Sequence, residues 1–115
     1  MFEFAYKEII DDSPQAMRAQ EAWAMDRVID LLREAQAKGA GSRETIAALY
    51  QLRRLWAVFI EDLQGPENAL PEGLRARLIS IGIWVNKEID RVRTGASRDL
   101  TPLIEINQII RDGLN

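Results

Sequence analysis

The chain has 115 residues, the size of a single domain, and it contains neither histidine nor cysteine. Hydrophobic residues make up 47% and charged residues 29% of it, and the formal net charge is only −3. These values exclude a disulfide-stapled scaffold and a strongly basic nucleic-acid-binding protein. Met1–Glu8 lacks the pattern of a signal peptide, and the longest mostly apolar run, Leu78–Val85, is too short to span a membrane. We therefore predict one cytoplasmic domain over residues 1–115.

The first long helix is predicted from about Pro14 to Lys38, because apolar residues recur there with helical spacing. Ser13 before Pro14 is typical of a helix start, and the glycines of Gly39–Gly41 are typical of a helix end. The expected inward face consists of Met25, Val28, Leu31, Leu32 and Ala35.

A second helix is predicted from Arg43 to Leu63, with Ser42 as its N-cap and Gly65-Pro66 as its end. Its apolar residues are spaced three and four apart, as one face of a helix requires. They are Leu49, Leu52, Trp56, Phe59 and Leu63.

A third helix is predicted to open at Pro71 and to close at Gly95, and a fourth to run from a cap at Asp99 to Gly113. The third helix has the apolar stripe Leu74, Leu78, Ile81, Val85, Ile89 and Val92; the fourth has Leu103, Ile106 and Ile110 facing inward. Since strand signals are almost absent and connections are short, we predict an all-α fold. It is a small antiparallel helical bundle of three or four main helices.

The residues needed for most enzymatic chemistry are missing. Without histidine and cysteine, the commonest general base, the thiol nucleophile and the best soft metal ligands are absent. Two acidic pairs remain, Asp11-Asp12 and Glu61-Asp62. Adjacent residues on a helix point about 100° apart, so Glu61 and Asp62 cannot easily share one proton or metal. We predict that the protein is not an enzyme and holds no cofactor and no metal.

Nucleic-acid binding is not expected either. The arginines occur in small groups such as Arg53-Arg54, each beside acids or apolar residues. Phosphate recognition normally requires a concentrated basic face.

The third helix carries more apolar residues than one face needs. Ile79 and Ile83 fall on the side away from the Ile81/Val85 stripe, and Trp84 lies at its edge. Two explanations remain open. The helix is the buried centre of the bundle, or the extra side chains form a groove that receives an amphipathic helix of another protein. Both can hold, with some residues in the core and others lining the groove.

Several short motifs, in this order and over nearly the whole chain, resemble the FlaF family of alphaproteobacterial flagellar proteins. They are Ala5-Tyr6, Leu55-Trp56 with Phe59, Leu70-Pro71-x-x-Leu74-Arg75, and the ending Leu103-Ile104-Glu105-Ile106-Asn107-x-x-Ile110-x-x-Gly113-Leu114.

The resemblance implies an all-α cytoplasmic protein that is needed for flagellin synthesis and export. Such proteins bind flagellin, whose ends are long amphipathic segments, as a dedicated chaperone and act alongside the regulator FlbT. Together with the apolar surplus, the resemblance gives six candidate partner-binding residues: Leu55, Trp56, Phe59, Ile79, Ile83 and Trp84. Two alternatives stay open: a post-transcriptional regulator of flagellin that acts on its message or with FlbT, and a homodimeric structural adaptor.

Overall fold

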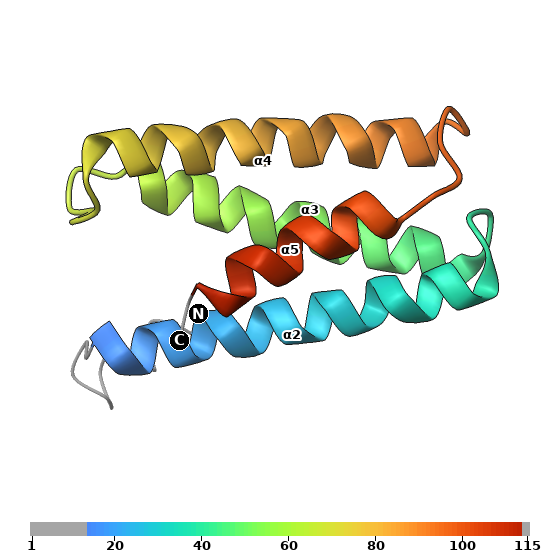
Figure 1. Ribbon diagram of the computed structural model, residues 1–115, viewed down its shortest axis with the longest axis horizontal. Helices are drawn as coiled ribbons and strands as arrows, with labels where there is room; N and C mark the ends of the chain where they lie inside the picture. The colour runs from blue at the N-terminus through green and yellow to red at the C-terminus, as the bar shows by residue number, and fades with distance from the viewer. Residues whose placement is uncertain (1–13, 114–115) are drawn as a thin grey trace.

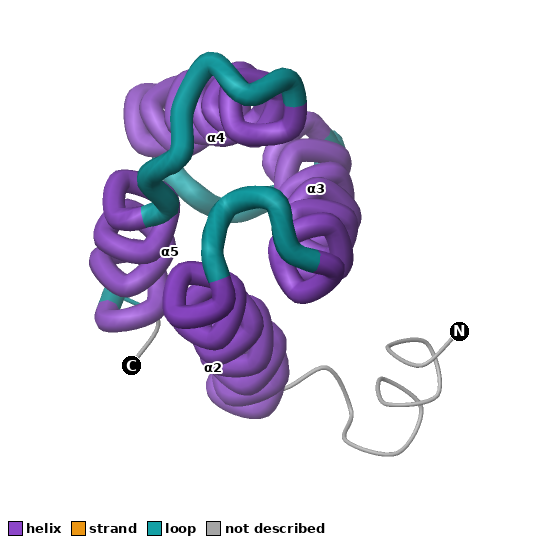
Figure 2. Tube along the Cα trace, turned by 90° about the vertical axis from the view of Figure 1, so that its right-hand side faces the viewer, coloured by secondary structure: helices purple, strands orange, loops and turns teal. Residues whose placement is uncertain are grey.

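The computed structural model describes the backbone of residues 14–113 and the side chains of residues 20–113. The described part contains four helices and no strand. They are α2 (Pro14–Lys38), α3 (Arg43–Gln64), α4 (Glu72–Arg93) and α5 (Thr101–Asp112). Successive helices run in opposite directions, and viewed end-on the four form a ring (Figures 1 and 2). The predicted all-α antiparallel bundle is confirmed; the predicted cap at Ser13 and the Ala5-Tyr6 motif lie outside the described residues.

The turn between α2 and α3 forms as its sequence predicts. Gly39 has a φ of +105°, a conformation that glycine adopts without steric cost, and its N–H donates to the carbonyl of Ala35. Ser42 is the N-cap of α3, and its Oγ accepts the backbone N–H of Thr45 at 3.2 Å. These two residues reverse the chain so that α3 returns along α2.

The start of α5 differs slightly from the prediction. Leu100 occupies the N-cap position, and Asp99, the predicted cap, lies one residue earlier. Asp99 nevertheless supports the first turn, because its Oδ1 accepts the backbone N–H of Thr101 at 2.9 Å. Gln36 of α2 reaches the same place: its Oε1 accepts the N–H of Leu100, and its Nε2 donates to the Oγ1 of Thr101. The beginning of α5 is thereby fixed to the C-terminal part of α2.

The path of α5 determines where the bundle is open. The helix backbones approach most closely in three pairs, α2 with α3, α2 with α5, and α3 with α4. In Figure 1, α5 begins beside the C-terminal end of α4 and runs obliquely away from it toward the N-terminal part of α2. Arg111 near the end of α5 donates to both carboxylate oxygens of Asp26 on α2, at 2.7 and 3.3 Å. This hydrogen bonding also raises the pKa of Arg111 above its ordinary value.

Only one half of α4 is fully covered as a result. The C-terminal part of its predicted stripe (Val85, Ile89 and Val92) is buried, whereas the N-terminal part (Leu74, Leu78 and Ile81) is only half-buried. On its outer side, Ile83 is 50% exposed and Trp84 41% exposed. The explanation that α4 is the buried centre of the bundle is therefore wrong, because the outer face of α4 is open to solvent in the described part of the chain.

A glycine allows α4 to lie close against α3. A Cβ added to Gly82 would be 2.7 Å from Cδ1 of Ile60 and 3.1 Å from Cε3 of Trp56. The end of the Ile60 side chain can turn aside, but the buried Trp56 ring is held on several sides and cannot. Gly82 is thus required for close approach, although its helical backbone conformation is ordinary.

We expect Gly82→Ala to lower the free energy of unfolding by about 1–2 kcal/mol, since the cost of overpacking exceeds the gain of alanine over glycine within a helix. Gly73→Ala is the matched control on the same helix, because a Cβ there meets nothing within 4 Å. That change should leave stability unchanged or raise it by up to about 1 kcal/mol. Urea unfolding followed by circular dichroism measures both; equal effects would show that α4 does not pack closely at Gly82.

The cap of α5 should make the stability of the fold depend on pH. The backbone N–H of Thr101, and then the side chains of Thr101 and Gln36, hold the pKa of Asp99 below its ordinary value of 3.8. A carboxylate with a lowered pKa stabilises the fold above its unfolded pKa and loses that contribution as the pH falls through the folded pKa. We therefore expect Asp99→Asn to be less stable than the native chain near neutral pH, with the difference shrinking below about pH 4. A constant difference across urea titrations at each pH would contradict this role.

Candidate functional site

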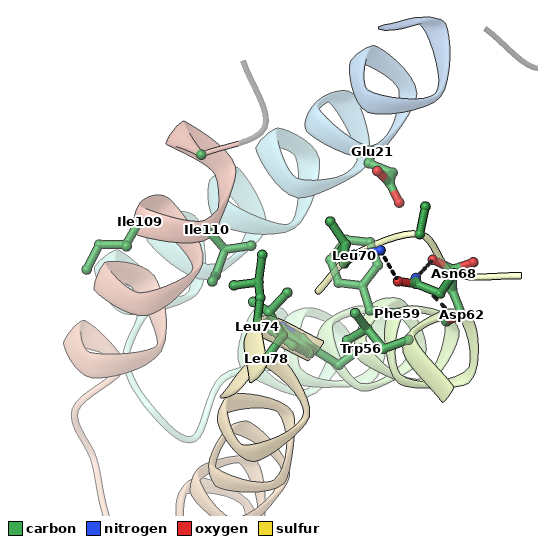
Figure 3. A pocket seen from close by; sticks show the side chains of 13 residues that line it. Glu21, Trp56, Phe59, Asp62, Asn68, Leu70, Leu74, Leu78, Ile109 and Ile110 are labelled. Atoms are coloured by element: carbon green, nitrogen blue, oxygen red, sulfur yellow. Dashed lines mark hydrogen bonds between the residues drawn. The ribbon is translucent and has the colours of Figure 1, made fainter. Parts of the chain in front are cut away.

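A cavity of about 570 Å³ opens where α5 diverges from α4. We call it the main cavity. It is bounded by all four described helices and by the α3–α4 turn, and most of its lining side chains are apolar (Figure 3). The lining residues are Glu21, Trp56, Phe59, Asp62, Leu63, Asn68, Ala69, Leu70, Leu74, Leu78, Ile109, Ile110 and Gly113.

Trp56 is the rigid floor of the main cavity. The residue is only 1% exposed, and its indole Nε1–H donates to Oδ1 of Asn107 on α5 at 2.8 Å. Asn107 is itself fully buried and donates through Nδ2 to the carbonyl of Leu103 at 2.7 Å. Phe59 meets the Trp56 ring edge to face, with 5.5 Å between the ring centroids. The buried indole N–H of Trp56 and the buried amide of Asn107 therefore each have a hydrogen-bond partner.

The α3–α4 turn forms one rim and presents Leu70. The side chain of Asn68 donates through Nδ2 to the carbonyl and to Oδ2 of Asp62, both at 3.2 Å. Its Oδ1 accepts the backbone N–H of Leu70 at 3.0 Å. Figure 3 shows these bonds beside Leu70, which lies next to Phe59 and is 41% exposed. A hydrogen-bonded turn thus holds an exposed leucine over the cavity.

The opposite wall comes from α4 and α5. Leu74 and Leu78 project from α4 toward Ile110 of α5, and all three are half-buried (Figure 3). Arg75, between the two leucines, donates through Nη1 to the carbonyl of Leu63 at 3.3 Å and so ties α4 to the end of α3. The cavity wall is consequently part of the fold's own helix packing.

A second, shallower hollow of about 400 Å³ lies further along α4 and α5. We call it the side cavity. Its lining residues are Ile81, Trp84, Pro102, Glu105, Ile106 and Ile109. Ile109, which is 64% exposed, lines both hollows.

The structure divides the six sequence-predicted site residues. Trp56 and Phe59 line the main cavity, and Trp84 lines the side cavity. The other three line neither: Leu55 and Ile79 are half-buried, and Ile83 is exposed on α4 away from both hollows.

Sequence reasoning missed the leucines and isoleucines that complete the main cavity: Leu70, Leu74, Leu78, Ile109 and Ile110. Helical spacing places Leu74 and Leu78 in the apolar stripe of α4 and does not mark them as cavity residues. The lengths of the helices carried a signal, because α4 has 22 residues and α5 only 12. At 1.5 Å per residue these are about 33 Å and about 18 Å, so α5 can cover only about half of α4.

The main cavity offers mostly apolar surface, and a few polar groups lie at its rim. Within residues 14–113, no group of three or more acidic side chains is arranged to hold a metal ion. No helix in this part of the chain is long and apolar enough to cross a membrane. A ligand that binds to this lining would remove its apolar side chains from water.

The fold and the cavity together define a small all-α protein with an open apolar cavity. Comparison with protein families gives a match to the flagellar protein FlaF over residues 2–114. The chain therefore belongs to the FlaF family of flagellar proteins, as the motifs of its sequence predict. A search of curated proteins and a search of solved structures gave no match.

The Trp56–Asn107 hydrogen bond should behave as a coupled pair. Asn107→Leu leaves a buried indole N–H without a partner, so we expect a loss of about 1–3 kcal/mol in the free energy of unfolding. With Trp56→Phe in the same chain, that N–H is gone, and the added cost of Asn107→Leu should be clearly smaller. A double-mutant cycle by urea unfolding tests this; strictly additive effects would show that the bond contributes no coupling.

Proposed function

We propose that this protein is a cytoplasmic chaperone that binds an amphipathic segment of flagellin in the main cavity before flagellin is exported. The observation that carries the proposal is the main cavity itself, an open apolar hollow in a protein of a flagellar family. Flagellin is the partner that the family resemblance implies, and its ends supply segments with an apolar face.

The lining suits an apolar helix face better than a small polar ligand. Leu70, Leu74 and Ile110 converge from the turn, α4 and α5, and each still has surface exposed to solvent. A helix laid over them would remove that surface from water together with its own apolar side chains. Each large apolar side chain that is fully buried in this way contributes about 1.5–3 kcal/mol.

The expected affinity is moderate, which fits a chaperone that must release its cargo. Ordering a flexible segment and losing its freedom of movement oppose binding by several kcal/mol, about as much as two or three buried side chains contribute. A site of this size therefore protects apolar segments without holding them permanently.

A matched pair of variants tests where flagellin binds. Leu70 and Ile83 are apolar and similarly exposed, at 41% and 50%, but only Leu70 lines the main cavity. We expect Leu70→Asp to weaken flagellin binding at least about tenfold, because a charge replaces apolar contact. Ile83→Asp should leave the affinity within about twofold.

Binding is measured by isothermal titration of the full chain with flagellin from the same organism, after circular dichroism has shown that both variants keep their helicity. The reverse pattern, in which Ile83→Asp loses flagellin binding and Leu70→Asp keeps it, would place the contact on the outer side of α4. Absence of any complex with the native chain would refute the proposed function.

A further inference from the structure

The main cavity and the side cavity are two parts of one apolar track. Ile109 lines both, and on α4 the lining passes without a break from Leu78 in the main cavity to Ile81 in the side cavity, one turn later. Ile106, one turn before Ile109 on α5, continues the other wall. The track therefore follows the seam along which α5 separates from α4.

The length of the track corresponds to about three helical turns. On α4 it extends from Leu74 to Trp84, and ten residues of helix rise about 15 Å. A bound helix of the same length presents apolar residues at positions i, i+4, i+7 and i+11 on one face.

The described charged residues that line the two hollows are all acidic, and Arg75 beside the wall is bound to the carbonyl of Leu63. Among the described residues that line the two hollows, the charged ones are Glu21 and Asp62 at one end and Glu105 at the other. No lysine or arginine is among the lining residues described. A partner with basic residues beside its apolar face would complement these carboxylates, and an acidic partner would be repelled.

We infer that the full binding surface is this track, from the main cavity across Ile109 to the side cavity, and that it selects a three-turn amphipathic helix of another protein flanked by lysine or arginine. The inference extends the proposed function by specifying the helix that the site accepts. The chain's own first 13 residues fit poorly, because they contain Glu3, Glu8, Asp11 and Asp12 against the single base Lys7.

The test uses the full chain and dye-labelled helical peptides of about 14 residues with leucines at i, i+4, i+7 and i+11. One peptide carries lysines beside the leucine face, and its counterpart carries glutamates at the same positions. In fluorescence anisotropy at low salt, the lysine peptide should bind at least about tenfold more tightly, and the difference should shrink as salt is added. Equal binding of both peptides would overturn the charge selection.

Variants test the extent of the track. Ile109→Asp should weaken binding of the lysine peptide at least about tenfold. Trp84→Ser in the side cavity should weaken this binding about fivefold or more. Glu105→Lys should weaken it about two- to fivefold, whereas Asp30→Lys, an exposed acid of α2 outside both cavities, should have no effect. If Leu70→Asp abolishes binding while Trp84→Ser and Glu105→Lys do not change it, the site ends at the main cavity and the inference is wrong.

Two other outcomes would show that a different occupant fills the track. Tighter peptide binding after Phe4→Ser would show that the chain's own N-terminal segment occupies the track. Concentration-dependent dimers in sedimentation that Ile109→Asp dissociates would assign the track to a second copy. Either result overturns the inference. If the lysine peptide binds as expected but flagellin does not, the proposed function fails and the inferred selectivity stands.

Discussion

The burial of one side chain, Trp56, is the constraint on which the rest of the structure depends. Its indole N–H donates a hydrogen bond to Asn107 of α5, its ring meets Phe59 of its own helix edge to face, and α4 approaches it closely at Gly82. Residues from three helices therefore converge on one ring. Because the bond to Asn107 is directional, it fixes where α5 crosses the bundle as well as how closely it packs. The same ring is the floor of the main cavity, so the core and the candidate site share a residue.

The cavity stays open because α5 is anchored to α2 at both of its ends. Gln36 binds the first turn of α5, and Asp26 binds Arg111 in its last turn. Between these anchors α5 follows α2, and a helix of 12 residues cannot also cover the N-terminal half of α4. The half-buried Leu74 and Leu78 that remain contribute less to folding than fully buried leucines would. Apolar surface that folding leaves uncovered is the surface on which a partner can gain free energy by binding.

The helices were predictable from the sequence, but the cavity was not. Periodicity, Ser42 and the glycines at positions 39 and 95 define where helices begin and end, since these signals are local. Periodicity also assigns Leu74 and Leu78 correctly to the inward face of α4. It carries no information on whether a neighbouring helix reaches that face, which depends on the tilt of α5 and hence on contacts such as Asp26–Arg111, 85 residues apart. The family motif predicts Trp56 and Phe59, which line the main cavity, whereas Ile83 is predicted only from being apolar outside the stripe and lines neither cavity.

Residues at the floor and at the rim of the main cavity differ in how freely they can be substituted. A change at Trp56, Gly82 or Asn107 alters the fold and the shape of the cavity together, so these positions have little freedom to adjust affinity. Leu70, Ile109 and Glu105 lie at the edge, where a side chain can change with little effect on core packing. Under the proposed function, the strength of cargo binding is set at the rim, by exposed apolar area and by charge, while the floor keeps the cavity in place. A chaperone can therefore be adapted to a particular flagellin, and kept weak enough to release it, without losing its fold.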